Sequence, residues 1–404
     1  MQVRPVCADA GVSVGTFYNH FADREVFLKL VIRDVRERSE LVRHTDRARV
    51  VARETEIFGL FEVTLKLFID MCVSERSVYS EIVQAERSDR DTALRRYQVD
   101  VDSIEASTKL LATMAGIDDP LHVRRLRRAV RLISVGVRQG YSGTVQYLEE
   151  LDARRPHVLD EIVHIAMAIL NAPEPAPLEH QALTVDVTTS HQDATLDLIL
   201  NATELVIAEK GTQSMTILDV SYEACVAPSS IYHYVESKDE LVSKLTGRAS
   251  RDVMAIALQL YSSATARGAT AQEKVLDLIA VFYRCVCERG YVLHSVGHLD
   301  PGSGVSIDES TGLYRVTFDM AFDLLCGAFG VARSDLSVEV TDRLTLLGHL
   351  VSTVIVQAGW GPVPFLDSIE LDERSLLALL GNVVFERASA LFAEDDSTMS
   401  SDWR

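Results

Sequence analysis

Apolar residues recur along this chain at intervals of three and four positions, which is the spacing of one face of an α-helix. The range 61–72 shows this spacing in the first half of the chain, and the range 276–283 shows it in the second half. Alternation of apolar and polar residues, which is typical of strands, is rare. The pattern therefore predicts an all-α fold.

A helix, a tight turn and a second short helix are predicted near the start of the chain. Gly11 suits the left-handed position at which a helix ends, and Ser13 can cap the next helix by accepting a hydrogen bond from an amide. Val12, Phe17 and Phe21 are expected to face inward. The second helix is short and polar enough outside to enter the major groove of DNA.

A second copy of this motif begins at Ala224, because 224–235 aligns without a gap on 10–21. We call the separation of Ala10 from Ala224 the repeat offset. Two further segments find matches close to this offset: Cys72 to Arg76 matches Cys285 to Arg289, and Leu151 to Arg154 matches Leu371 to Arg374. Self-similarity at so long a period predicts a duplicated unit.

Both copies resemble the helix-turn-helix of the TetR/AcrR (tetracycline-repressor) family, whose run has the form Ala-Gly-Val-Ser-x-Gly-Thr-x-Tyr-x-His-Phe. The resemblance implies that the second helix enters the major groove of a double-stranded DNA operator and that the tyrosine, the histidine and the next basic residue contact phosphates. The implied DNA-binding residues of the first copy are Ser13, Val14, Gly15, Thr16, Tyr18, Asn19, His20 and Arg24. Those of the second copy are Pro228, Ser229, Ser230, Tyr232, His233, Tyr234 and Lys238.

The second copy departs from the family pattern at two positions. Cys225 replaces the turn glycine and Ala227 replaces the capping serine, and loss of a serine cap typically costs about 1 kcal/mol. Pro228 compensates in part because it suits the first position of a helix, and Ser237 with Glu240 predicts a capping box for the helix that follows.

The first copy has no counterpart of the helix that precedes the second copy. That helix is predicted over 194–210 and to end at Gly211, with an apolar side formed by Leu198, Ile199, Ala202, Leu205 and Val206. Met1 aligns beside Met215, so the first copy starts after the place where such a helix belongs. We expect a longer native chain with this helix before Met1, in preference to a truncated motif.

A length of 404 residues suits two units of about 200 residues each, and three prolines between Asn171 and Pro177 predict the seam. With the resemblance, the chain divides into a first helix-turn-helix domain (1–45), a helical regulatory domain (46–170), a Pro-rich linker (171–190), a second helix-turn-helix domain (191–248), a second regulatory domain (249–393) and a tail (394–404).

The resemblance also implies how the regulatory domains act. In the family, such a domain holds a small apolar effector, and its last helices form a four-helix bundle with a partner, here as an intramolecular pseudo-dimer or a homodimer. Polar and aromatic candidates for the lining of an effector pocket are Tyr79, Arg138, Tyr141, His349 and Trp360.

The net charge of −19 opposes DNA binding, but its distribution differs between the copies. Arginines accompany the first motif, whereas acidic residues outnumber basic ones around the second. We therefore expect DNA affinity mainly in the first motif.

Other chemistry finds little support. The six cysteines are expected to be free, buried thiols, and neither Cys285 with Cys287 nor His294 with His298 is expected to bind metal. Gly302 to Gly304 is predicted to be a loop. No residues suggest catalysis or a cofactor, so an enzyme on this scaffold is a distant third interpretation. No apolar run approaches the roughly 20 residues of a membrane span, and no leader segment is evident, so a cytoplasmic chain is expected.

The leading interpretation is a sequence-specific transcriptional regulator, with repression as the expected direction. The alternative is a helical module that binds a ligand or a protein and whose DNA-reading motifs have decayed.

Overall fold

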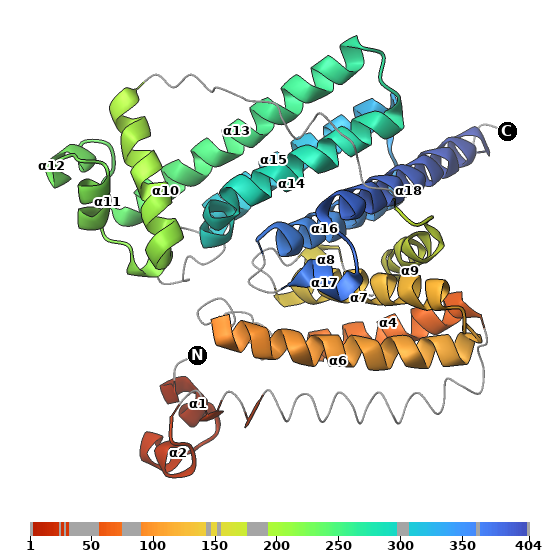
Figure 1. The fold of residues 1–404 in the computed structure, drawn as a ribbon, viewed down its shortest axis with the longest axis horizontal. Coiled ribbons are helices and arrows are strands. Elements are labelled where there is room, and N and C mark those ends of the chain that lie inside the picture. Colours follow the sequence, from red (N-terminus) through yellow and green to blue (C-terminus); the bar gives the residue numbers. More distant parts are fainter. Residues whose placement is uncertain are drawn as a thin grey trace. The chain divides into compact units, whose positions relative to one another are not determined.

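The computed structural model describes residues 3–23, 26–27, 30–31, 56–74, 90–142, 147–151, 155–175, 193–296, 307–360 and 364–401. Every regular element within these ranges is a helix, which confirms the all-α prediction (Figure 1). The chain divides into two compact units, Met1–Val163 and His164–Arg404.

The first unit contains two short helices followed by longer ones. The helices are α1 (Val3–Asp9), α2 (Val14–His20), α4 (Ile57–Ser74), α6 (Arg90–Ala115), α7 (Pro120–Ser142), α8 (Tyr147–Glu150) and the start of α9 (Pro156–Asn171). α1 packs against α2, and α4, α6 and α7 pack against one another. α8 lies on α7, where the buried Tyr147 hydroxyl donates to the Gly136 carbonyl at 2.7 Å.

In the second unit a group of helices lies together at one end of the long helix that follows them in the chain (Figure 1). The elements after α9 are α10 (Ala194–Ser214), α11 (Ile217–Glu223), α12 (Pro228–Ile231), α13 (Lys238–Ala266), α14 (Ala271–Val296), α15 (Ile307–Ala328), the 3-10 turn η2 (Arg333–Asp335), α16 (Val338–Trp360), α17 (Phe365–Ile369) and α18 (Glu373–Ser401). α10 packs against α11, α13 and α14, while α14 also packs against α13, α15, α16 and α18.

Helices of the two units begin at matching positions. α1 and α11 start and end at positions separated by the repeat offset. The starts of α2 and α12, and of α4 and α14, keep the same offset. α7 and α16 each contain 23 residues, and their starts at Pro120 and Val338 are separated by a slightly larger offset. The described helices α1, α2, α4 and α7 thus have counterparts in the same order in α11, α12, α14 and α16.

The helix ends also repeat. α6 is followed by Gly116 (φ +65) and α15 by Phe329 and then Gly330 (φ +72), and both glycines are left-handed. In each case the next amide donates to the carbonyl five positions earlier, at 2.8 Å after α6 and 3.1 Å after α15. This pattern closes the helix and satisfies a terminal carbonyl. The loop after Gly330 is longer than that after Gly116 and contains η2, which accounts for the larger offset of α7 and α16.

α10 differs from its predicted form in two ways. It continues through Gly211 to Ser214, so the predicted end at Gly211 is wrong. A helical glycine costs only about 1 kcal/mol, which the packing of α10 against α11, α13 and α14 can outweigh. Ile199, Ala202 and Val206 are buried as predicted, together with Leu200 and Ile207. Leu198 and Leu205 are exposed, contrary to expectation, because they lie outside this buried face.

The cysteines form no disulfide, and four of them are buried as predicted, but Cys225 and Cys287 are exposed. α9 ends at Asn171, and 172–175 are not helical, which agrees with the prolines there.

Part of α18 corrects the expectation about apolar runs. The segment Glu373–Asp395 is long and apolar enough to cross a membrane by length and composition alone. Most of it is buried within the protein, and Glu386 and Arg387 interrupt it, so it has the character of a core helix.

Replacing Cys225 by glycine is expected to raise the free energy of unfolding by about 1 kcal/mol. Cys225 has a φ of 52°, a left-handed conformation in which a side chain is strained and glycine is not. Urea denaturation followed by circular dichroism measures the change. Cys225→Ala is the control, since it removes the thiol but keeps the strained Cβ. Equal stabilisation by both substitutions would contradict this explanation.

Candidate nucleic-acid interface

The first motif has the local geometry that its sequence predicts. Gly11 is left-handed (φ +66), and the amide of Val12 donates to the Cys7 carbonyl at 2.9 Å, which closes α1. Ser13 then caps α2, because its hydroxyl accepts from the amide of Thr16 at 3.0 Å. The cap and the turn together fix the direction in which α2 leaves α1.

α2 buries one residue and presents the others to solvent. Phe17 is 4% exposed. The centre of its ring lies 5.0 Å from the ring centre of Phe21 and 5.1 Å from that of Phe27. Phe21 is half-buried, whereas Val12 is exposed, so the expectation that Val12 faces inward is wrong. The candidate residues Ser13, Val14, Gly15, Thr16, Tyr18, Asn19 and His20 are all exposed, and Arg24 lies outside the described residues.

The second motif is opened by a capping box that the sequence analysis missed. The hydroxyl of Thr216 accepts from the amide of Asp219 at 3.2 Å, and the Asp219 carboxylate accepts from the amide of Thr216 at 2.9 Å. Lys210 donates to the same carboxylate at 2.7 Å. These bonds, that of Lys210 first, lower the pKa of Asp219 to about 2. The spacing Thr-x-x-Asp was a readable signal.

The turn and the cap of the second motif have the predicted defects. Cys225 takes the left-handed conformation of a turn glycine, and Ala227 provides no side-chain cap for α12, which starts at Pro228. α12 has four residues, compared with seven in α2. The second motif therefore folds on the same plan but with a shorter second helix.

Two of the candidate residues of the second motif are held by the protein itself. The ammonium of Lys238 donates to the Met215 carbonyl at 3.3 Å. Tyr234 packs against the buried core, and its hydroxyl lies 3.4 Å from the Asp193 carboxylate. Of the others, Pro228, Ser229, Tyr232 and His233 are exposed, and Ser230 is half-buried.

The predicted capping box at the start of α13 is only half formed. Ser237 accepts from the amide of Glu240 at 3.1 Å, but the Glu240 carboxylate accepts from the amide of Glu236 rather than that of Ser237. In the first unit Asp23 caps the matching turn, since it accepts from the amide of Val26 at 2.8 Å.

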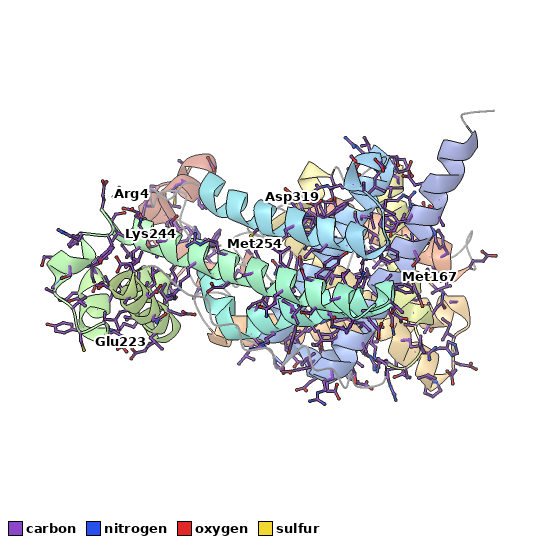
Figure 2. All side chains as sticks on the ribbon, turned by 90° about the horizontal axis from the view of Figure 1, so that it is seen from above. Arg4, Met167, Glu223, Lys244, Met254 and Asp319 are labelled. Carbon is purple, nitrogen blue, oxygen red and sulfur yellow. The ribbon has the colours of Figure 1, made fainter. Side chains whose placement is uncertain are left out.

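The outer faces of α1 and α11 differ in their attraction for phosphate. α11 exposes Leu218 and Tyr222, whereas the residues that align with them at the repeat offset are Arg4 and Ala8, both also exposed. Both helices end in an exposed acidic residue, Asp9 on α1 and Glu223 on α11 (Figure 2), so the difference in charge lies at Arg4 and Leu218. An arginine releases counterions on binding DNA and a leucine does not, so charge favours the first motif.

The candidate residues for an effector pocket differ in burial and in the partners they contact. Arg138 on α7 pairs with Asp100 on α6, and Tyr141 is buried. His349 on α16 is buried and stacks on Phe318 with ring centres 4.1 Å apart, and burial lowers its pKa to about 3, which keeps it neutral. Tyr79 lies outside the described residues, and Trp360 ends α16 with a side chain outside them.

The described residues contain no group of three or more His, Cys, Asp or Glu side chains able to hold a metal ion. Cys285 is buried and Cys287 exposed, so they face different sides of α14. His298 and the range 302–304 lie outside the described residues, as does the side chain of His294.

The second motif matches a known family model. Residues 199–245 match the family model described as "Bacterial regulatory proteins, tetR family". The matched range begins in α10 and ends in α13, so it contains α11 and α12 entirely. The match supports membership of the TetR family and a TetR-type transcriptional regulator with a DNA-binding helix-turn-helix. A search of curated proteins gave no match.

Lys238→Met is expected to leave the salt dependence of DNA binding unchanged, because the ammonium is engaged with the Met215 carbonyl. Fluorescence anisotropy at several salt concentrations gives the slope of log affinity against log salt. Each phosphate contact contributes about 0.9 to this slope. If the slope becomes smaller by that amount in the variant, Lys238 does contact a phosphate. The thermal midpoint of the variant reports the loss of the hydrogen bond to the Met215 carbonyl.

Proposed function

We propose that this chain is a sequence-specific, ligand-responsive transcriptional repressor of the TetR type, built from two tandem units and acting in the cytoplasm. The observation that carries the proposal is the succession of helices that recurs at the repeat offset, one copy of which contains the family match. Each unit would consist of a helix-turn-helix domain and a helical regulatory domain. The proposal assigns no catalytic residue.

The exposed surface of α2 supports DNA contact in the first unit. Tyr18 is 51% exposed and His20 is exposed beside it, so both can hydrogen-bond to phosphates without a change of fold. Val14, Thr16 and Asn19 would face base edges, where an amide can pair with adenine and an apolar group can contact the thymine methyl.

We further propose that the two units pair within one chain as a pseudo-dimer through their last long helices. Covalent linkage supports this arrangement, since it makes the second unit available at high effective concentration. A single chain would then present two reading helices of different sequence and length.

A second candidate function is a ligand- or protein-binding module whose second motif no longer reads DNA. The bonds of Lys238 and Tyr234 to the protein, the exposed Leu218 and Tyr222, and the shorter α12 favour this for the second motif. These observations concern the second motif only and say nothing against DNA contact by α2.

Tyr18→Ala is expected to weaken binding to a selected operator about 10-fold or more, because a hydrogen bond to a charged phosphate contributes about 1.5 to 3 kcal/mol. Tyr232→Ala is the matched variant, since Tyr232 occupies the same position and is similarly exposed at 56%. Its expected effect is smaller. Gel-shift titrations at one salt concentration compare the two, and the reverse order would show that the second motif dominates.

A further inference from the structure

α11 exposes two large apolar side chains on one face. Leu218 is 51% exposed and Tyr222 is 74% exposed. They lie one turn apart, so they are neighbours on the helix surface, and we call them the apolar pair. The residues that align with them in the first motif are Arg4 and Ala8. The shared fold therefore does not require apolar residues at these positions.

A row of acidic residues lies beside the apolar pair. Asp219 follows Leu218 and Glu223 follows Tyr222 in the chain, so the two carboxylates also lie one turn apart. Hydrogen bonds from Lys210 and then from the Thr216 side chain lower the pKa of Asp219 to about 2, so this carboxylate is ionised at neutral pH. Glu223 is exposed. An apolar surface bordered by carboxylates attracts a basic partner and repels phosphate.

The basic residues of the second helix-turn-helix domain do not offset its acidic ones. The range 193–248 contains nine acidic residues and four basic ones. Three of the basic side chains pair with carboxylates, namely Lys210 with Asp219 at 2.7 Å, Lys244 with Glu240 at 3.3 Å and Arg248 with Glu204 at 3.0 Å. The fourth, Lys238, donates to the Met215 carbonyl. The domain therefore keeps an excess of negative charge.

The apolar pair stands on a helix that the protein itself fixes. The Thr216–Asp219 capping box opens α11, and the hydroxyl of Ser221 donates to the Val226 carbonyl at 2.7 Å. Little ordering of α11 is then needed when a partner binds. Two side chains cover much less than the about 800 Å² per partner that a stable interface buries. The surface therefore fits a short segment of a partner better than a whole second copy of this chain.

We propose that the exposed face of α11 docks a short basic segment of another protein. An apolar side chain of that segment would pack against the apolar pair, and its lysine or arginine side chains would pair with Asp219 and Glu223. The docking does not itself depend on DNA binding, but its role rests on the proposed function: it would bring a second protein to a chain that reads DNA through α2.

Fluorescence anisotropy with the full-length chain and three labelled synthetic peptides tests the docking. The first peptide repeats Lys-Leu-Ala-Lys, the second has glutamine in place of leucine, and the third has glutamate in place of lysine. The first should bind about 10-fold or more tightly than either of the others. Leu218→Ala combined with Tyr222→Ala should weaken its binding about 10-fold. Glu223→Gln should weaken it about 2- to 3-fold, because a charge at the rim of an interface contributes less.

Leu258→Ala combined with Val338→Ala is the matched control. Leu258 on α13 and Val338 on α16 are 46% and 75% exposed, so this variant removes similar apolar exposure away from α11. It should bind the first peptide as the wild type does. Thermal unfolding followed by circular dichroism checks that both double variants fold. Equal binding of the three peptides, an unchanged affinity of the α11 variant, or an equal loss in the control would each overturn the proposal.

The α11 variant also tests two other occupants of this face. If the face contacts DNA, the variant will lose affinity for a selected operator by a similar factor. If a second copy of the chain covers it, sedimentation of the wild type will show concentration-dependent association that the variant lacks. Either result would overturn the proposal.

DNA binding by the same preparations separates this inference from the proposed function. Operator binding by a chain that does not bind the first peptide would refute the docking surface alone. Peptide binding that depends on the apolar pair, in a chain with no affinity for DNA, would refute the regulator and leave the surface in place.

Discussion

Both helix-turn-helix motifs depend on one reversal of the backbone, in which the residue after the first helix takes a left-handed conformation. Gly11 and Cys225 occupy this position with φ values of 66° and 52°. The reversal lets the next amide close the first helix and sets the direction of the second. It is almost free for glycine and strained for cysteine. The exposed face of α2 therefore rests on a relaxed turn, whereas α12 starts from a strained one without a side-chain cap.

The two units keep one plan but have changed different parts of it. Phe17, Phe21 and Phe27 form an aromatic group in the first motif, and the residues that align with them at the repeat offset are Ile231, Val235 and Leu241, all buried. Their outer surfaces differ as well: α1 exposes Arg4 where α11 exposes Leu218, and α2 has seven residues where α12 has four.

The sequence was most informative where structure is set by neighbours in the chain. The left-handed Gly11, the Ser13 cap and Pro228 at the start of α12 follow from local backbone chemistry, and the repeat located both motifs. Contacts between distant residues could not be predicted in this way. The bond of Lys238 to the Met215 carbonyl depends on how α13 meets the end of α10. Exposure of Leu198 and Leu205 likewise reflects which face of α10 its neighbours cover.

Salt-dependent binding to a mixed pool of double-stranded DNA tests the central claim most directly. If the chain is a sequence-specific regulator, log affinity falls linearly with log salt, by about 0.9 per phosphate contact, and repeated selection enriches a common sequence. That enriched sequence should bind about a thousandfold or more tightly than the starting pool. Absence of binding at low salt, or salt-dependent binding without any enrichment, would contradict the account.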